Sequence, residues 1–99
     1  MLHIINKSPL QTRTLETCLR TMQPGHALLL IEDGVTGATT ASATEAQVRQ
    51  ACATFKVYAL QPDLDARGLT GRLIEGITLV DYGGFVDLTL AHSTSHSWL

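Results

Sequence analysis

The sequence carries little charge and no excess of basic residues. Only 16% of its 99 residues are charged, and seven Lys and Arg stand against nine Asp and Glu, for a net charge of −2. Proteins that bind nucleic acid directly usually present a basic face, because each neutralised phosphate releases counterions. Here the basic residues are scattered among acidic ones, so we expect no direct contact with nucleic acid.

Long apolar runs are also missing. No stretch approaches the roughly 20 apolar residues that a membrane-spanning helix needs. Residues 1–6 contain no Lys or Arg, and their apolar run is too short for a signal peptide. We therefore expect a cytoplasmic protein without a membrane partner. In that reducing compartment the two cysteines, Cys18 and Cys52, are expected to be free thiols.

Recognisable catalytic motifs are absent as well. The glycines at 34–37 and 83–84 are too sparse for a dinucleotide-binding loop. The four histidines and two cysteines lack the spacing of a metal motif, and no nucleophilic serine elbow occurs. We expect no cofactor and no bound metal. Enzymatic activity is left open, but nothing indicates catalysis by this chain alone.

Strand-like and helix-like segments alternate along the chain. Strands are expected at 2–5, 27–31, 56–60 and 77–80, the second being a continuous apolar run typical of a buried parallel strand. Possible capping boxes at 8–11 and 44–47 predict two helix starts. Behind them, apolar residues recur with helical spacing: Leu15, Cys18, Leu19 and Met22, then Val48, Ala51, Cys52 and Phe55.

The remaining segments complete an α/β pattern. Residues 34–42 are small and predict a loop or weak helix, and 63–67 form at most a short helix ended by Gly68. Asp81 can cap a last helix, and the tail from residue 92 is polar except for Trp98 and Leu99. Strands joined by helical crossovers predict a single three-layer α/β/α domain over 1–99, with a mostly parallel, flavodoxin-like sheet.

Four acidic residues follow the expected strands: Glu32, Asp33, Asp63 and Asp81. Carboxylates there could hold Mg²⁺. A phosphoryl-accepting receiver domain is excluded, because residues 6–7 and 60–61 lack its acids. Asp33 before a glycine is more typical of a turn, and Asp81 of a helix cap.

Cys18 is the candidate for sulfur chemistry. A persulfide-carrying thiol must be accessible and have a lowered pKa, which Arg20, His3 or His26 could help to provide. The helical spacing instead places Cys18 within an apolar stripe, and free cysteines often behave as small buried hydrophobes. Both interpretations stay open.

Trp98 stands near the end of an otherwise polar tail. Burying so large an aromatic side chain is worth a few kcal/mol, so we do not expect it to remain in water. It can fold back onto its own domain or anchor in a partner subunit. The low charge of the chain also favours a protein with covered surfaces.

The chain resembles one family, the TusB/DsrH sulfur-relay subunits, over essentially its whole length. Each matching piece is short, but their order and spacing are specific. The resemblance rests on 1–3, 8–9, 28–30, 33–35, 56–60, 63–64, 66–69, 81–82, 85–86, 88–89, His92 and Trp98.

This resemblance implies a DsrE/F/H-like domain in a heterohexamer with TusC/DsrF-like and TusD/DsrE-like sister subunits. Such a complex passes persulfide sulfur, through a downstream acceptor protein, toward 2-thiolation of the tRNA wobble uridine. The main sulfur-accepting cysteine belongs to the TusD/DsrE-like subunit. The resemblance therefore implies a mainly structural role for the present chain. Asp33, Asp81, Tyr82 and Trp98 are the candidate interface residues.

Three alternatives remain. DsrH-type members, which serve dissimilatory sulfur oxidation, carry a cysteine in the first helix, and Cys18 occupies the matching position. The chain could then carry persulfide directly. A third hypothesis is a stand-alone homo-oligomer that binds a small anion at the strand ends.

Overall fold

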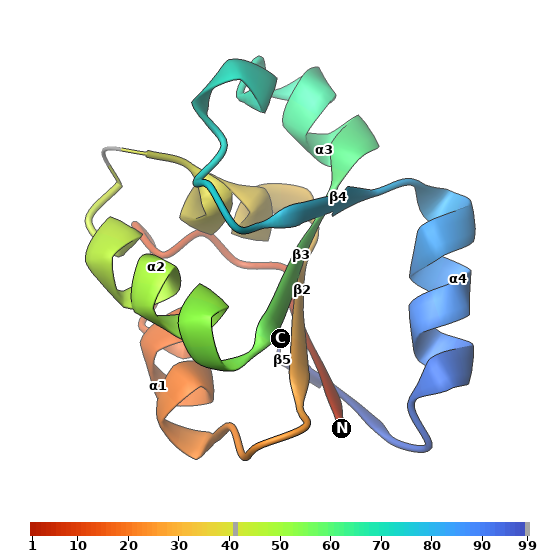
Figure 1. Ribbon diagram of the computed structural model, residues 1–99. Coiled ribbons are helices and arrows are strands. Elements are labelled where there is room, and N and C mark those ends of the chain that lie inside the picture. The colour runs from red at the N-terminus through yellow and green to blue at the C-terminus, as the bar shows by residue number, and fades with distance from the viewer. Residues whose placement is uncertain (41, 99) are drawn as a thin grey trace.

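The computed structural model describes residues 1–40 and 42–98, which form one five-stranded sheet with helices around it (Figure 1). The strand order is β4-β3-β2-β1-β5, and every neighbouring pair is parallel. In chain order the elements are β1 (Leu2–Ile5), α1 (Thr14–Thr21), β2 (Ala27–Leu30), the 3-10 helix η1 (Glu32–Ala38), α2 (Glu45–Thr54), β3 (Lys56–Leu60), α3 (Gln61–Ala66), the 3-10 helix η2 (Thr70–Arg72), β4 (Thr78–Val80), α4 (Tyr82–Ala91) and β5 (Ser95–Trp98). The expected α/β domain with a parallel sheet is confirmed.

The two faces of the sheet are covered unequally. Helices α1 and α2 lie on one face, and α4 lies on the other (Figure 1). The larger core, under α1 and α2, includes Leu15, Cys18, Leu28, Leu30 and Val48. The smaller core, under α4, is built from four buried residues: Leu2, Ile4, Ala27 and Leu29.

The first helix begins later than its apparent capping box predicts. Ser8 Oγ accepts a hydrogen bond from Leu10 N at 3.1 Å, and Ser8 O accepts from Gln11 N and Thr12 N. These contacts close a local turn, and α1 starts only at Thr14, after Arg13. The predicted start at Ser8 was wrong, because the serine stabilises a turn rather than a helix N-terminus.

Other helix ends follow the sequence more closely. Helix α2 begins directly after Thr44, although the Thr44 side chain makes no capping hydrogen bond. Asp81 caps α4, because its Oδ1 accepts from Gly84 N at 2.8 Å. Gly68 follows α3 with φ of 66°, a conformation suited to glycine at a helix end.

Gly34 marks the tightest backbone approach in the sheet region. It lies in η1, where the small-residue segment forms a 3-10 helix that passes over the carboxyl end of β1. A Cβ atom at this position would lie 2.3 Å from Ile5 O. Only glycine therefore lets η1 pack this closely against β1.

The polar tail forms a strand that its sequence does not predict. Residues Ser95–Trp98 pair with β1 in parallel and extend the sheet beyond it. The Trp98 indole nitrogen Nε1 donates a hydrogen bond to His3 Nδ1 at 3.1 Å. The tail therefore folds back onto its own domain, one of the two outcomes left open for Trp98.

Candidate functional site

Cys18 lies in the middle of α1 and is fully buried. It belongs to the core cluster shared with Leu28 and Leu30 of β2. Burial raises the pKa of the Cys18 thiol to about 12, because a thiolate there would lose its hydration. At pH 7 this thiol is therefore protonated and lacks the thiolate form that sulfur transfer requires. In this structure Cys18 is a core residue.

The second cysteine is partly accessible. Cys52 lies in α2, is half-buried and is not bonded to Cys18, so both thiols are free, as expected. Burial raises the pKa of the Cys52 thiol, and the nearby Arg49 charge opposes that rise only in part. Neither thiol has the lowered pKa that marks a reactive cysteine.

The acids at the strand ends bind other parts of the chain. Asp63 Oδ2 accepts from Glu32 N at 2.6 Å. Arg67 donates to Asp33 Oδ1 from Nη2 at 2.9 Å and to the Asp63 carbonyl from Nη1 at 3.2 Å. These bonds tie η1 to α3 across the carboxyl edge of the sheet. Their geometry stabilises a loop junction and leaves no arranged set of metal ligands.

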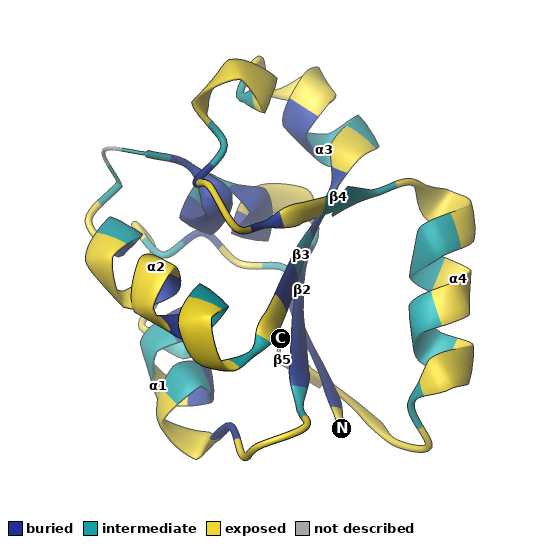
Figure 2. Ribbon diagram, viewed as in Figure 1, coloured by how far each residue is buried: buried dark blue, intermediate teal, exposed yellow. Residues whose placement is uncertain are grey.

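The helix α4 exposes an apolar stripe. Tyr82, Val86 and Leu90 are 63%, 54% and 78% exposed, and their spacing of four residues places them on one side of the helix. Phe85 and Leu88, on the other side, pack against the smaller core. No residue of α4 is buried, and Figure 2 shows its ribbon without a dark blue segment. Such a helix, apolar on both sides, is typical of an element covered by another protein.

The four candidate interface residues do not form one patch. Asp33, Asp81 and Trp98 lie near the carboxyl ends of three different strands, β2, β4 and β5. Asp33 pairs with Arg67, Asp81 caps α4, and Trp98 bonds to His3. Tyr82 alone belongs to the exposed stripe.

Sequence reasoning missed the contribution of Val86 and Leu90 to that stripe. Neither residue is among the candidate interface residues named from the sequence. The available signal was a helix with apolar residues at 82, 85, 86, 88 and 90, more than one buried face can accommodate.

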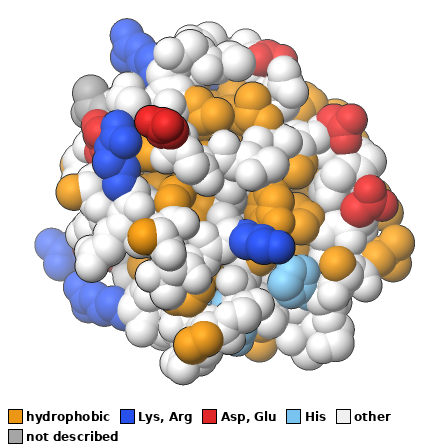
Figure 3. All heavy atoms as spheres, in the orientation of Figure 1, with side chains coloured by type: hydrophobic (Ala, Val, Ile, Leu, Met, Phe, Trp, Pro, Cys, Tyr) orange, Lys and Arg blue, Asp and Glu red, His pale blue; other side chains and the backbone are white. Residues whose placement is uncertain are grey.

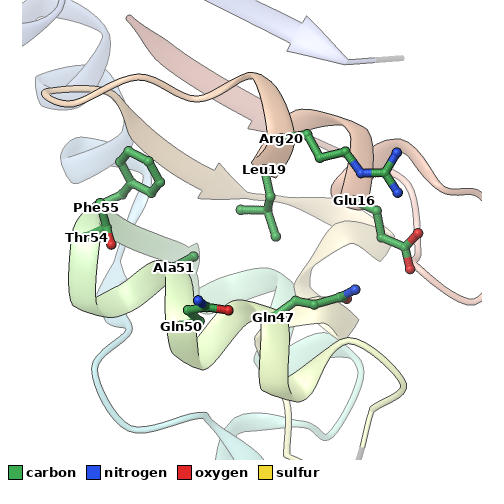
Figure 4. A pocket seen from close by; sticks show the side chains of 8 residues that line it. All are labelled: Glu16, Leu19, Arg20, Gln47, Gln50, Ala51, Thr54 and Phe55. Atoms are coloured by element: carbon green, nitrogen blue, oxygen red, sulfur yellow. The ribbon is translucent and has the colours of Figure 1, made fainter.

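A groove of about 290 Å³ separates α1 from α2 (Figure 4). Polar and apolar side chains from both helices line it: Glu16, Leu19, Arg20, Gln47, Gln50, Ala51, Thr54 and Phe55. Neither cysteine is among them, so the groove gives no access to a thiol. Arg20, once a candidate to activate Cys18, lies here instead.

Within residues 1–40 and 42–98, no group of three or more His, Cys, Asp or Glu side chains is placed to hold a metal ion. Across the same residues no helix has the length and apolar character to cross a bilayer.

Comparison with solved structures identifies proteins that have a similar fold. YchN from Escherichia coli matches with a TM-score of 0.82 over 97% of both chains, at 18% identity. The protein MTH1491 from Methanobacterium thermoautotrophicum matches with a TM-score of 0.77 over 97% of this chain and 95% of its own, at 17% identity. At such identities the likeness concerns the fold alone.

Sequence comparison identifies the family. The model of the DsrH like protein family matches residues 7–95. Protein TusB of Escherichia coli O81 is 44% identical over 98 residues, which cover 99% of this chain and 100% of that protein. Protein TusB of Shigella flexneri is 43% identical with the same coverage. The chain therefore belongs to the TusB/DsrH family.

Proposed function

We propose that this chain is a structural subunit of a cytoplasmic sulfur-relay complex that serves 2-thiolation of the tRNA wobble uridine. Its partners are TusC/DsrF-like and TusD/DsrE-like sister subunits, joined with it in a heterohexamer. The sister subunit of the TusD/DsrE type holds the persulfide and passes its sulfur to a downstream acceptor. This chain supplies a surface to which the other subunits bind, and none of its thiols takes part in the reaction.

The observation that carries this proposal is the 44% identity with TusB over the full length of both proteins. Two features of the chain agree with a structural role. Its one thiol at the family's cysteine position, Cys18, is fully buried with a raised pKa. Its α4 helix exposes three large apolar side chains that a partner subunit could cover.

Function can be tested in cells that lack TusB. Expression of this chain should restore 2-thiouridine, measured by mass spectrometry of nucleosides from purified tRNA. Cys18→Ala should restore it equally well, because the proposal assigns no sulfur to that thiol. Restoration by the wild type but not by Cys18→Ala, with equal protein levels, would contradict the structural role.

Assembly needs its own experiment. Co-expression of this chain with the two sister subunits and gel filtration with light scattering should give one complex that contains all three. A chain that remains a free homo-oligomer beside its sister subunits would support the stand-alone hypothesis instead.

The alternative role as a direct persulfide carrier is favoured by the position of Cys18 in the first helix. In that reaction the Cys18 thiolate attacks the outer sulfur of a donor persulfide, and the donor leaves as a thiolate. The buried thiol would first require α1 to open. Mass spectrometry of the chain after exposure to a persulfide donor, with Cys18→Ser as control, tests this role: one added sulfur on Cys18 supports it, and its absence supports the structural role.

Cys18 also agrees with a second alternative, a DsrH-type role in dissimilatory sulfur oxidation, because DsrH-type members carry a cysteine at this position. Failure to restore 2-thiouridine by a chain that still assembles with its sister subunits would favour that branch.

A further inference from the structure

A second cavity, of about 430 Å³, lies at the amino-terminal edge of the sheet. It is formed where β2 and β3 begin and where α2 and α4 end. Its lining includes His26, Lys56, Tyr58 and His92, and contains no Asp or Glu. Figure 3 shows, on the face in view, a Lys or Arg side chain beside a histidine and surrounded by hydrophobic atoms.

The positive groups of this cavity have no acidic partner. In the described part of the chain, the salt bridges join Arg49 to Glu45 and Arg67 to Asp33, and neither involves the cavity. Burial lowers the pKa of His92, and the charges of the N-terminal ammonium, His26 and Lys56 lower it further. The residues that line the cavity therefore contribute positive charge, and no Asp or Glu among them compensates it.

Hydrogen bonds fix which nitrogen of His26 carries the proton. Trp98 Nε1 can only donate, so His3 Nδ1 must accept its hydrogen bond, and the proton of neutral His3 lies on Nε2. His3 Nε2 then donates to His26 Nδ1 at 3.0 Å, which also accepts from Gln23 N at 3.2 Å. His26 Nδ1 is thus occupied as an acceptor, and the free Nε2 of His26 is a donor.

The basic residues at this edge could also serve the fold alone, by balancing the negative ends of α2 and α4. Each helix C-terminus carries about half a negative charge, and nearby cations stabilise it. Two such ends amount to about one negative charge. Lys56, which lines the cavity, offsets this charge, and the N-terminal ammonium adds positive charge close enough to act on His92.

We propose that this cavity binds a small tetrahedral oxyanion of the phosphate or sulfate class, held by Lys56 and by donors from His26 and His92. The Tyr58 hydroxyl can add a further hydrogen bond. The site lies at the amino ends of the strands, away from Cys18 and from the acids at the carboxyl edge. It does not depend on the proposed role in sulfur relay.

The test is a titration of the full-length chain with sodium sulfate, followed through the NMR signals of the histidine rings, with chloride keeping the ionic strength constant. We expect saturable shifts of the His26 and His92 signals and a rise in the pKa of His92 when sulfate is bound. Phosphate should compete for the same site. Sulfate is the primary probe because its charge does not change near neutral pH.

Matched variants distinguish binding at a specific site from a general effect of sulfate on the charges of the protein. Lys56→Gln should weaken sulfate binding about tenfold, because a charge-assisted contact is lost. Lys7→Gln removes the same charge from an exposed position at the other edge of the sheet and should leave the affinity unchanged. His92→Asn, checked for native folding, should weaken binding as well.

Three outcomes would overturn the site. They are shifts that rise linearly without saturation, shifts that chloride reproduces, and equal weakening by Lys56→Gln and Lys7→Gln. Each would mean that the basic residues only balance the helix ends.

Discussion

The two faces of the sheet differ in how completely the chain covers them. Under α1 and α2, fully buried side chains such as Leu28 and Leu30 belong to the larger core, to which both helices contribute buried residues. Under α4, one helix without a buried residue covers a small cluster and turns Val86 and Leu90 to the outside. We infer that the first face supplies most of the stability of the isolated chain, whereas the second leaves apolar side chains that another protein can cover.

The largest effect on the stability of the isolated chain is expected in the α1/α2 core. Leu30→Ala removes a fully buried side chain and should lower the free energy of unfolding by about 3 kcal/mol. Leu88→Ala, a matched change of a half-buried leucine under α4, should cost only about 1 kcal/mol. Urea unfolding followed by circular dichroism measures both. Equal losses would contradict the difference between the faces.

Cys18→Ser should have the next largest effect. It places a hydroxyl group in the apolar core and should lower the free energy of unfolding by about 2 kcal/mol. The same burial predicts that a thiol reagent labels Cys52 of the folded wild-type chain far faster than Cys18. Mass spectrometry of the labelled chain identifies which thiol reacted, and rapid labelling of Cys18 would indicate that α1 opens.

A smaller effect is expected from acid. The pKa of His3 is lowered from 6.5, first by burial and then by His26, His96 and the N-terminus, and the pKa of His92 is lowered in the same direction. The unfolded chain therefore binds more protons near and below pH 6.5, so stability should fall as the pH falls from 7 to 5. Urea unfolding at several pH values measures this slope, which should be shallower for His3→Gln. An unchanged slope would rule out His3 as its source.

The smallest effect on stability should accompany a large effect on assembly. Leu90→Glu changes a side chain that is 78% exposed and should alter the free energy of unfolding by less than about 0.5 kcal/mol. If a partner covers α4, this charge should prevent co-purification with the sister subunits. Leu10→Glu is the matched control, because Leu10 is 70% exposed and lies outside the stripe. Assembly that survives Leu90→Glu would show that α4 faces solvent in the complex.

Local sequence predicted the buried elements well. Lys56–Leu60 has the expected bounds, and β2 and β4 each differ from expectation by one residue. The stripe through Leu15 and Cys18 predicted the side of α1 that is buried. Such patterns are reliable because a buried strand or helix face must be apolar along its own length.

The failures have a common physical cause. The Ser-His-Ser-Trp segment contains no apolar run, and it forms β5 because its backbone pairs with β1 at the opposite end of the chain. Likewise, Ser8 has the chemistry of a helix cap, and only the path of the chain decides that it bonds Leu10 in a turn. The histidine and Trp98 contacts also depend on that distant pairing, so no local pattern could reveal them.

The pairing of β5 with β1 also bears on how the protein is made. Strand β1 is made before the other four strands of this sheet, yet one of its two neighbours, β5, is made after all of them. Contacts between such distant segments form slowly, since the whole intervening loop must close first. The sheet can therefore be completed only after all five strands have been made, and until then the outer edge of β1 is open to pairing with other chains.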